Sequence, residues 1–342
     1  MEISRSLSTN SRISLIMRAR NSKILYAAMA SVALLVAGCS TAATPSLPDP
    51  SDPAAVTAKL TSKDAKEFLL EVSTYDWSDN GARAAEEFTW IPAAAASKDD
   101  QVAQQAGESA RAIAGFLADK HDQLLDIRSG LFSRNHTNVG QLNPDLVRSF
   151  GDALIPYQDA LVCDDSKVRG FDSLERCDTA MPAVQSVFEV VSTNAEAAAA
   201  FSEAAHEQVR QYIQTFADTE LSSPALYPAA QGLTYAGSLL GLLAVTANKN
   251  QGTPPIDINK EATEARYTIA KATLAREPGP SLPEKFFLNG VLMAPAQVRQ
   301  NLGDSAYSEY AAGLISFLTQ RNVETFVNHN IVGQFKLVTG ES

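Results

Sequence analysis

Apolar residues recur at three- and four-residue steps through most of this 342-residue chain, and this spacing limits what the chain can fold into. In Asp99–Gly130, for example, Val102, Ala106 and Ala110 fall on one side of an α-helix. Runs of β-branched residues with two-residue alternation, which are typical of strands, are scarce. The sequence therefore predicts an all-α fold, a multihelical bundle of about ten helices with no convincing sheet.

Turn formers and prolines divide the chain into helical segments. We expect helices over Ala54–Thr74, Ala82–Phe88, Asp99–Gly130, Asn143–Val162, Pro182–Val191, Thr193–Thr219, Pro228–Asn248, Asn259–Arg276, Phe286–Leu302, Ser305–Thr319 and Asn322–Phe335. Asn143 is the expected helix cap, with Pro144 in the first turn. The polar segment Phe132–Leu142 is expected to be a loop that separates two packed helical subdomains, residues 55–130 and residues 143–338.

The first 38 residues have the pattern of an export signal. Arg18, Arg20 and Lys23 precede the apolar run Ile24–Val36, which is shorter than the roughly 20 residues that span a bilayer as a helix. Small residues then lead directly into Cys39, and the sequence Leu35-Val36-Ala37-Gly38-Cys39 resembles a bacterial lipobox. We expect residues 1–38 to be a lipoprotein signal peptide, with translation starting at Met1 or Met17. An uncleaved membrane anchor is the alternative.

Lipidation of Cys39 would hold the mature chain on the outer face of the cell membrane through its acyl chains. Residues 39–54 are rich in Ser, Thr, Ala, Pro and Asp, so they are expected to form a flexible tether. Residues 1–38 carry a net charge of +4 out of a total of −11, which leaves −15 on the 304 residues that follow. Such an acidic chain is a poor partner for nucleic acid and for anionic lipid head groups.

Two cysteines remain beyond the lipidation site, Cys163 and Cys177, and a segment rich in turn formers lies between them. Outside the cytoplasm this spacing predicts a disulfide. A pair of metal-binding thiolates is the alternative, but it lacks Cys-x-x-Cys spacing and a nearby histidine.

No metal site, cofactor or catalytic residue is expected from the sequence. The four histidines, His121, His136, His206 and His329, lie on different segments without paired spacing, and hydrolase and phosphate-loop motifs are absent. The acidic pairs Asp99-Asp100 and Asp164-Asp165 are the remaining groups that could bind a divalent cation or transfer a proton. Asp99-Asp100 has a sufficient role in stabilising the start of a helix.

Several phrases, taken in order, resemble a helical region of actinobacterial secreted proteins that is often labelled a "TPR repeat region". They are Asn143-Pro144-Asp145-Leu146 with Pro156-Tyr157, Gly170–Leu174, Val187–Val191 with Asn194–Ala198, Ala204-Ala205 followed by Gln211-Tyr212, and Ala236–Leu243. The resemblance covers roughly residues 100–310. It implies a helical fold and a connection with type VII secretion, and it carries no known catalytic site.

These observations favour a lipid-anchored scaffold or interaction module with an unidentified protein partner. The alternative is a lipoprotein that binds an apolar small molecule or lipid between helices, in a cavity of several hundred Å³. Phe188, Phe201, Leu239 and Leu243 are the expected lining of that cavity. An enzyme is a weaker third alternative, which needs acidic, His or Ser side chains that meet in a cleft.

Overall fold

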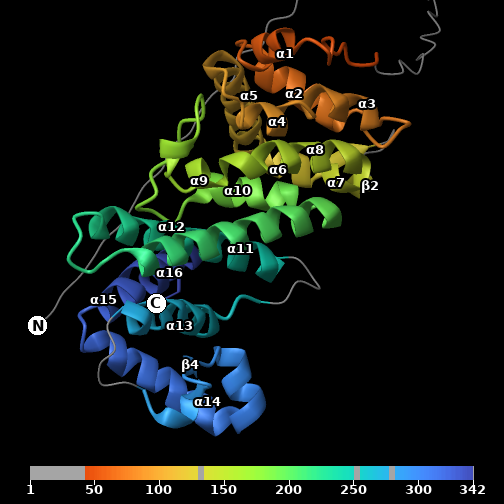
Figure 1. Ribbon diagram of the computed structural model, residues 1–342. Coiled ribbons are helices and arrows are strands. Elements are labelled where there is room, and N and C mark those ends of the chain that lie inside the picture. The colour runs from red at the N-terminus through yellow and green to blue at the C-terminus, as the bar shows by residue number, and fades with distance from the viewer. Residues whose placement is uncertain (1–42, 130–134, 250–254, 277–281, 342) are drawn as a thin grey trace, which may run out of the picture. The chain divides into compact units, whose positions relative to one another are not determined.

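The computed structural model describes residues 43–129, 135–249, 255–276 and 282–341 (Figure 1). Helices dominate these residues, and the strands found among them form two antiparallel two-stranded hairpins. The predicted all-α fold class is therefore confirmed. Residues from Thr44 onward form one compact unit, and the fold is described for that unit.

The bounds of the elements are as follows. The helices are α1 (Pro53–Leu60), α2 (Ala65–Thr74), α3 (Ala82–Ala85), η1 (Glu86–Phe88), α4 (Ile91–Ala95), α5 (Asp100–Asp119), α6 (His121–Leu125), α7 (Val139–Leu142), α8 (Pro144–Leu154), η2 (Ile155–Tyr157), α9 (Gln158–Leu161), η3 (Asp165–Lys167), α10 (Pro182–Val191), α11 (Ala195–Asp218), α12 (Leu226–Lys249), α13 (Ile258–Arg276), η4 (Glu284–Phe286), α14 (Pro295–Thr319), α15 (Glu324–Phe326), η5 (Val327–Gly333) and α16 (Gln334–Thr339). The strands are β1 (Ile127–Ser129), β2 (Asn135–Thr137), β3 (Phe287–Leu288) and β4 (Val291–Leu292).

The helices pack largely in chain order, as Figure 1 shows. α1, α2 and α4 lie against α5, and α5 in turn contacts α8 and α10. α8 contacts α11, and α11 lies against both α12 and α13. α12 contacts η5 and α16, while α13 contacts α14. Because α5 packs directly on α8 and α10, helices from both sides of residues 131–142 share contacts, and the division into residues 55–130 and 143–338 stays a prediction.

α12 is an apolar helix that packs in the core of the unit. Leu226–Ala247 is the one helix in the described part of the chain that is long and apolar enough to cross a membrane, and most of it is buried inside the protein. A Cβ at Gly237 would lie 2.6 Å from the carbonyl oxygens of Asn330 and Ile331. A Cβ at Gly241 would lie 2.7 Å from Val338 Cβ. Both glycines therefore let η5 and α16 approach the backbone of α12.

Of two residues at expected helix starts, one caps its helix with its side chain and the other does not. Asp99 caps α5, since its side chain accepts hydrogen bonds from the backbone N–H groups of Gln101 and Val102. Asn143 precedes α8 as expected but does not cap it with its side chain. Its Nδ2 instead donates to the carbonyl oxygens of Ser73 (3.0 Å) and Tyr75 (2.8 Å). The fully buried Asn143 thus ties the end of α2 to the start of α8.

Two expected helices are wrong in their boundaries, and the described residues of the expected loop Phe132–Leu142 contain β2 and α7. The helix expected over Asp99–Gly130 ends at Asp119, and the chain continues through α6 into β1, which pairs with β2. The helix expected over Phe286–Leu302 begins at Pro295, because the preceding residues form the β3–β4 hairpin. The Asn289-Gly290 turn of that hairpin has φ values of 53° and 76°, a conformation that Asn and Gly favour.

Near the C-terminal end, the expected break between two helices is present. Gly303 has φ 83° and ψ 175° inside α14, so the helix is interrupted there. The last expected helix, Asn322–Phe335, is divided into α15, the π-helical segment η5 and α16.

At the N-terminal end of the unit, the Thr44 hydroxyl lies 3.1 Å from the Tyr75 hydroxyl, and Leu47 packs on the core. Thr44–Asp52, which the sequence assigns to the tether, therefore belong to the same unit as the helices.

Candidate functional site: a polar pocket beside the disulfide

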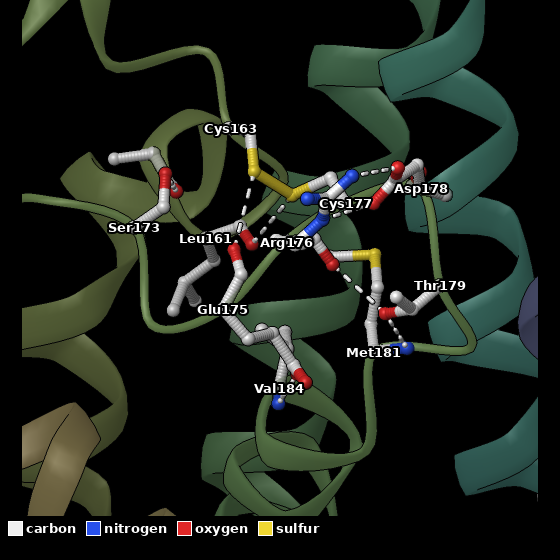
Figure 2. The surroundings of a disulfide bond; sticks show 12 residues. Leu161, Cys163, Ser173, Glu175, Arg176, Cys177, Asp178, Thr179, Met181 and Val184 are labelled. Carbon is white, nitrogen blue, oxygen red and sulfur yellow. Dashed lines mark hydrogen bonds and ion pairs between the residues drawn. A yellow bond between two sulfur atoms is a disulfide. The ribbon is translucent and has the colours of Figure 1, made fainter.

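Cys163 and Cys177 form a disulfide, as the sequence predicts, and their Cα atoms are 6.1 Å apart. Figure 2 shows how the loop that they close is fastened to α10: Glu175 Oε1 accepts a hydrogen bond of 2.9 Å from the backbone N–H of Val184. The carbonyl oxygen of Cys177 accepts a hydrogen bond of 3.0 Å from Gln334 Nε2. The loop is therefore held by α10 and α16 as well as by its own disulfide.

A pocket of about 500 Å³ opens beside this loop, between α11 and α12. We call it the Tyr212 pocket. It is lined by Cys163, Asp164, Asp165, Ser166, Lys167, Tyr212, Thr215, Thr219, Ala225, Pro228, Ala229, Gln231, Gly232 and Tyr235. The volume is within the range of small-molecule sites, and the lining combines aromatic surface with a few polar groups, which is typical of such sites.

Two tyrosines form the aromatic part of the pocket. The rings of Tyr212 on α11 and Tyr235 on α12 have centroids 5.6 Å apart and are tilted by 55°. A Cβ at Gly232 would lie 3.0 Å from Tyr212 Cδ1, so the glycine gives the Tyr212 ring room to lie against α12. Tyr212 itself is only 6% exposed.

The polar part of the pocket comes from the chain just before and after Cys163. The Tyr212 hydroxyl donates to Asp164 Oδ2 over 2.8 Å. Lys167 Nζ donates to Asp159 Oδ2 over 3.2 Å, lies 3.5 Å from Asp164 Oδ2, and sits 4.9 Å from the centroid of the Tyr212 ring. Asp159 lies at the edge of this group, and its Oδ1 is buried without a hydrogen-bond partner among the described residues.

The two carboxyl groups have pKa values shifted in opposite directions. Burial raises the pKa of Asp159 above its ordinary value, although the Lys167 charge opposes this effect. Burial also acts to raise the pKa of Asp164, but hydrogen bonds from Ser166 and Tyr212 together with Lys167 bring it below its ordinary value. Burial and the charges of Asp159 and Asp164 raise the pKa of Tyr212, so its phenol stays protonated and donates. Opposite shifts in neighbouring carboxyl groups are frequent at functional sites.

The cavity expected at Phe188, Phe201, Leu239 and Leu243 is much smaller than several hundred Å³. Phe188, Phe201 and Leu243 do line one hollow, but its volume is about 50 Å³. The rings of Phe188 and Phe201 pack edge to face with centroids 4.8 Å apart and fill most of the space. Leu239 is fully buried and does not line the hollow. This volume is close to that of one or two waters and does not hold a lipid.

The histidines do not converge, but one of them belongs to a buried polar cluster that the sequence did not reveal. His121 Nε2 lies 2.6 Å from Glu189 Oε2, and Lys249 contacts Glu189 Oε1. His121 Nδ1 also lies 2.8 Å from Asp122 Oδ1. Glu189 is only 8% exposed in its side chain, so this cluster ties α6, α10 and the end of α12 together.

A second buried ion pair fixes the C-terminal helices. Arg266 on α13 and Glu324 on α15 form a two-pronged pair, with Nη2 to Oε1 at 2.7 Å and Nε to Oε2 at 3.0 Å. Both side chains are less than a tenth exposed. Asn328 accepts a further hydrogen bond from Arg266 Nη2, so the pair has a structural role.

In the described part of the chain, no group of three or more His, Cys, Asp or Glu side chains is arranged to hold a metal ion. Cys39, the expected lipidation site, lies outside the described residues. The sequence drew attention to Asp164-Asp165 as an acidic pair, but not to Asp159, Lys167, Tyr212 and Tyr235. The sequence does contain a local signal for the polar part of this pocket, because Asp159, Asp164 and Lys167 lie within nine residues around one cysteine.

No protein family, curated protein or solved structure matches this chain.

Proposed function

We propose that the protein is an extracytoplasmic lipoprotein, acylated on Cys39, whose helical body is an interaction module that binds its partner molecule in the Tyr212 pocket. The observation that carries the proposal is that the Cys163–Cys177 disulfide closes the loop that forms one wall of this pocket. Disulfides persist in oxidising compartments, so the same bond that shapes the pocket supports a location outside the cytoplasm.

The N-terminal sequence supports the anchor. The basic residues, the short apolar run and Cys39 after Ala37-Gly38 together form the pattern of a lipoprotein signal. The net charge of −15 on the chain after residue 38 disfavours attachment to anionic head groups, so acyl chains are the proposed contact with the membrane. The resemblance to the actinobacterial "TPR repeat region" supports a protein partner connected with type VII secretion.

Replacement of the lipidation site tests the anchor. In Cys39→Ala the protein should leave the membrane fraction or accumulate as a precursor that keeps residues 1–38, whereas Ser40→Ala should stay in the membrane fraction at its normal mature mass. Intact cells treated with protease should lose the body of the wild-type protein. Unchanged membrane extraction of Cys39→Ala, or a body protected from protease, would contradict the proposal.

A photo-crosslinking residue placed in the pocket tests the binding site. Thr215 is exposed on α11 and lines the Tyr212 pocket, whereas Glu203 is exposed on the same helix away from it. In intact cells, irradiation should give a specific adduct from position 215 and none from position 203. Equal adducts from both positions, or none from either, would argue against the pocket as the binding site.

A further inference from the structure

Lys167 reaches into the Tyr212 pocket from its rim. Its side chain is 54% exposed, while the side chains of Asp159 and Asp164, which its ammonium group contacts, are 13% and 12% exposed. The ammonium group therefore sits between two sheltered carboxylates, at 3.2 Å and 3.5 Å, and above the Tyr212 ring. Carboxylates beside an aromatic face form an environment that binds organic cations.

The negative charge at this position exceeds the positive charge that the chain supplies. Asp159, Asp164 and Asp165 lie at or beside the pocket, and Lys167 is the one cationic side chain among the described residues that line it. Asp159 Oδ1 is buried without a hydrogen-bond donor in the described part of the chain. Asp159 does not itself line the pocket, so the carboxylates available to a ligand are those of Asp164 and Asp165, and their charge exceeds that of Lys167.

Space for an additional group remains with Lys167 in this position, because about 500 Å³ of the pocket is not filled by protein. Along the pocket, the Tyr235 ring, Pro228 and Ala229 give an apolar surface next to the charged end. A ligand that matches both parts carries a positive charge at one end of an aliphatic stem, as the lysine side chain itself does.

We propose that the Tyr212 pocket binds a primary ammonium group carried on an aliphatic chain, and that Lys167 competes with this ligand for the carboxylate of Asp164. The inference deepens the proposed function, since it names the chemistry recognised by the same pocket. The ammonium group has two possible sources, a free aliphatic amine or a lysine side chain of a protein partner.

Competition by Lys167 leads to effects of opposite sign in two variants. Removal of the ammonium in Lys167→Ala should tighten binding of a cationic ligand by about fivefold, since an exposed ion pair is worth up to about 1 kcal/mol. Removal of a carboxylate in Asp164→Asn should weaken binding by about tenfold or more, which is the worth of a hydrogen bond to a charged group. Tyr235→Leu, which keeps every charge, should weaken binding through loss of aromatic surface.

Isothermal titration calorimetry on the protein purified from its producing cells in nonionic detergent measures these effects. The probes are pentylammonium, its neutral counterpart 1-pentanol, and Nα-acetyl-lysine methylamide. Glu203→Gln, an exposed change on α11, is the matched control and should bind as the wild type does. Circular dichroism and thermal unfolding check that each variant is folded, and Lys167→Ala changes a side chain that is 54% exposed.

Binding of pentylammonium, with weaker or no binding of 1-pentanol and tighter binding to Lys167→Ala, supports the inference. Tighter binding of the lysine derivative than of pentylammonium supports a protein as the source of the group, and the reverse order supports a free amine. Weaker binding to Lys167→Ala would overturn the inference in favour of an anionic ligand held by Lys167. Equal binding of the two pentyl probes, or no binding to wild type and Lys167→Ala, would also overturn it. The anchor is measured separately through Cys39→Ala, so a lipidated protein that binds no ammonium refutes this inference alone.

Discussion

Because of Glu87 on η1, the free energy of unfolding should depend on pH between about 4.5 and 7. Its side chain is buried, with the residue only 2% exposed, and Oε2 has no hydrogen-bond partner among the described residues. Burial, followed by the negative charges of Asp49 and Glu86, raises the pKa of Glu87 from 4.5 to about 7. The folded protein therefore holds this carboxyl group in its neutral form over a range in which the unfolded chain ionises it.

The direction of the effect follows from proton binding. Below pH 4.5 the carboxyl group is protonated in both states. As the pH rises toward 7, the unfolded chain releases the proton and the folded protein retains it, so the free energy of unfolding falls. One unit of pKa corresponds to about 1.4 kcal/mol, so Glu87 should remove about 3 kcal/mol of stability between the two ends of this window.

Glu87→Gln removes this ionisation while it keeps the shape of the side chain. Near pH 4.5 the variant and the wild type should have similar stability, whereas above about pH 7 the variant should be more stable by about 3 kcal/mol at most. Urea unfolding followed by circular dichroism at both pH values measures the difference. Since other groups titrate equally in both proteins, the comparison isolates Glu87.

Glu71→Gln on α2 is the matched control, because Glu71 is exposed. Its stability difference from the wild type should not change across the window. Asp49→Asn should lower the pKa of Glu87, so the loss of stability should end at a lower pH and be smaller, but it should not disappear, since burial is the larger cause. A parallel pH dependence of the wild type and Glu87→Gln would refute the reasoning.

Three further changes test the packing of the body. Gly237→Ala places a Cβ 2.6 Å from two backbone carbonyl oxygens and should destabilise the protein by about 1–3 kcal/mol in urea unfolding. In the control Gly115→Ala the new Cβ contacts only an arginine side-chain nitrogen, so this variant should be as stable as the wild type or more stable. Glu324→Gln leaves a buried guanidinium without its counter-charge and should cost about 3–5 kcal/mol in the same assay. Cys163→Ala combined with Cys177→Ala opens a loop with a sequence separation of 14 and should cost about 3 kcal/mol, and an equal midpoint with and without reductant in the wild type would contradict this value.

The sequence predicts helices well where their ends carry a local signal. Asp99 caps the start of α5 and Pro156 interrupts the helices on either side of η2, both within expected segments, and Gly303 breaks α14 between the two segments expected there. These features depend on backbone preferences of single residues, which a sequence displays directly. The β3–β4 hairpin also has such a signal in Asn289-Gly290, but the spacing of the apolar residues around it predicts a helix.

The Tyr212 pocket could not be predicted in the same way, because it depends on contacts between distant parts of the chain. Tyr212 donates to Asp164, 48 positions earlier, and faces Tyr235 across two helices whose relative placement no local pattern gives. The volume of the expected apolar cavity could not be predicted for a related reason. Phe188, Phe201 and Leu243 line one hollow, but the packing density of their side chains decides its volume, and a periodic pattern contains no information on density.

The position of the disulfide connects the fold to the proposed binding. Cys163 has a positive φ of 69° and lies between Asp159 on one side and Asp164 and Lys167 on the other, so any movement of its backbone moves the polar side of the pocket. The bond to Cys177 and the hydrogen bond from Gln334 to its carbonyl oxygen restrain that backbone from α16. Reduction should therefore weaken the binding of a cationic probe under conditions in which the protein stays folded, since Asp164 and Lys167 lie on the segment that reduction releases and the core helices lie outside it. A loss of binding that only follows global unfolding would instead confine the disulfide to a structural role.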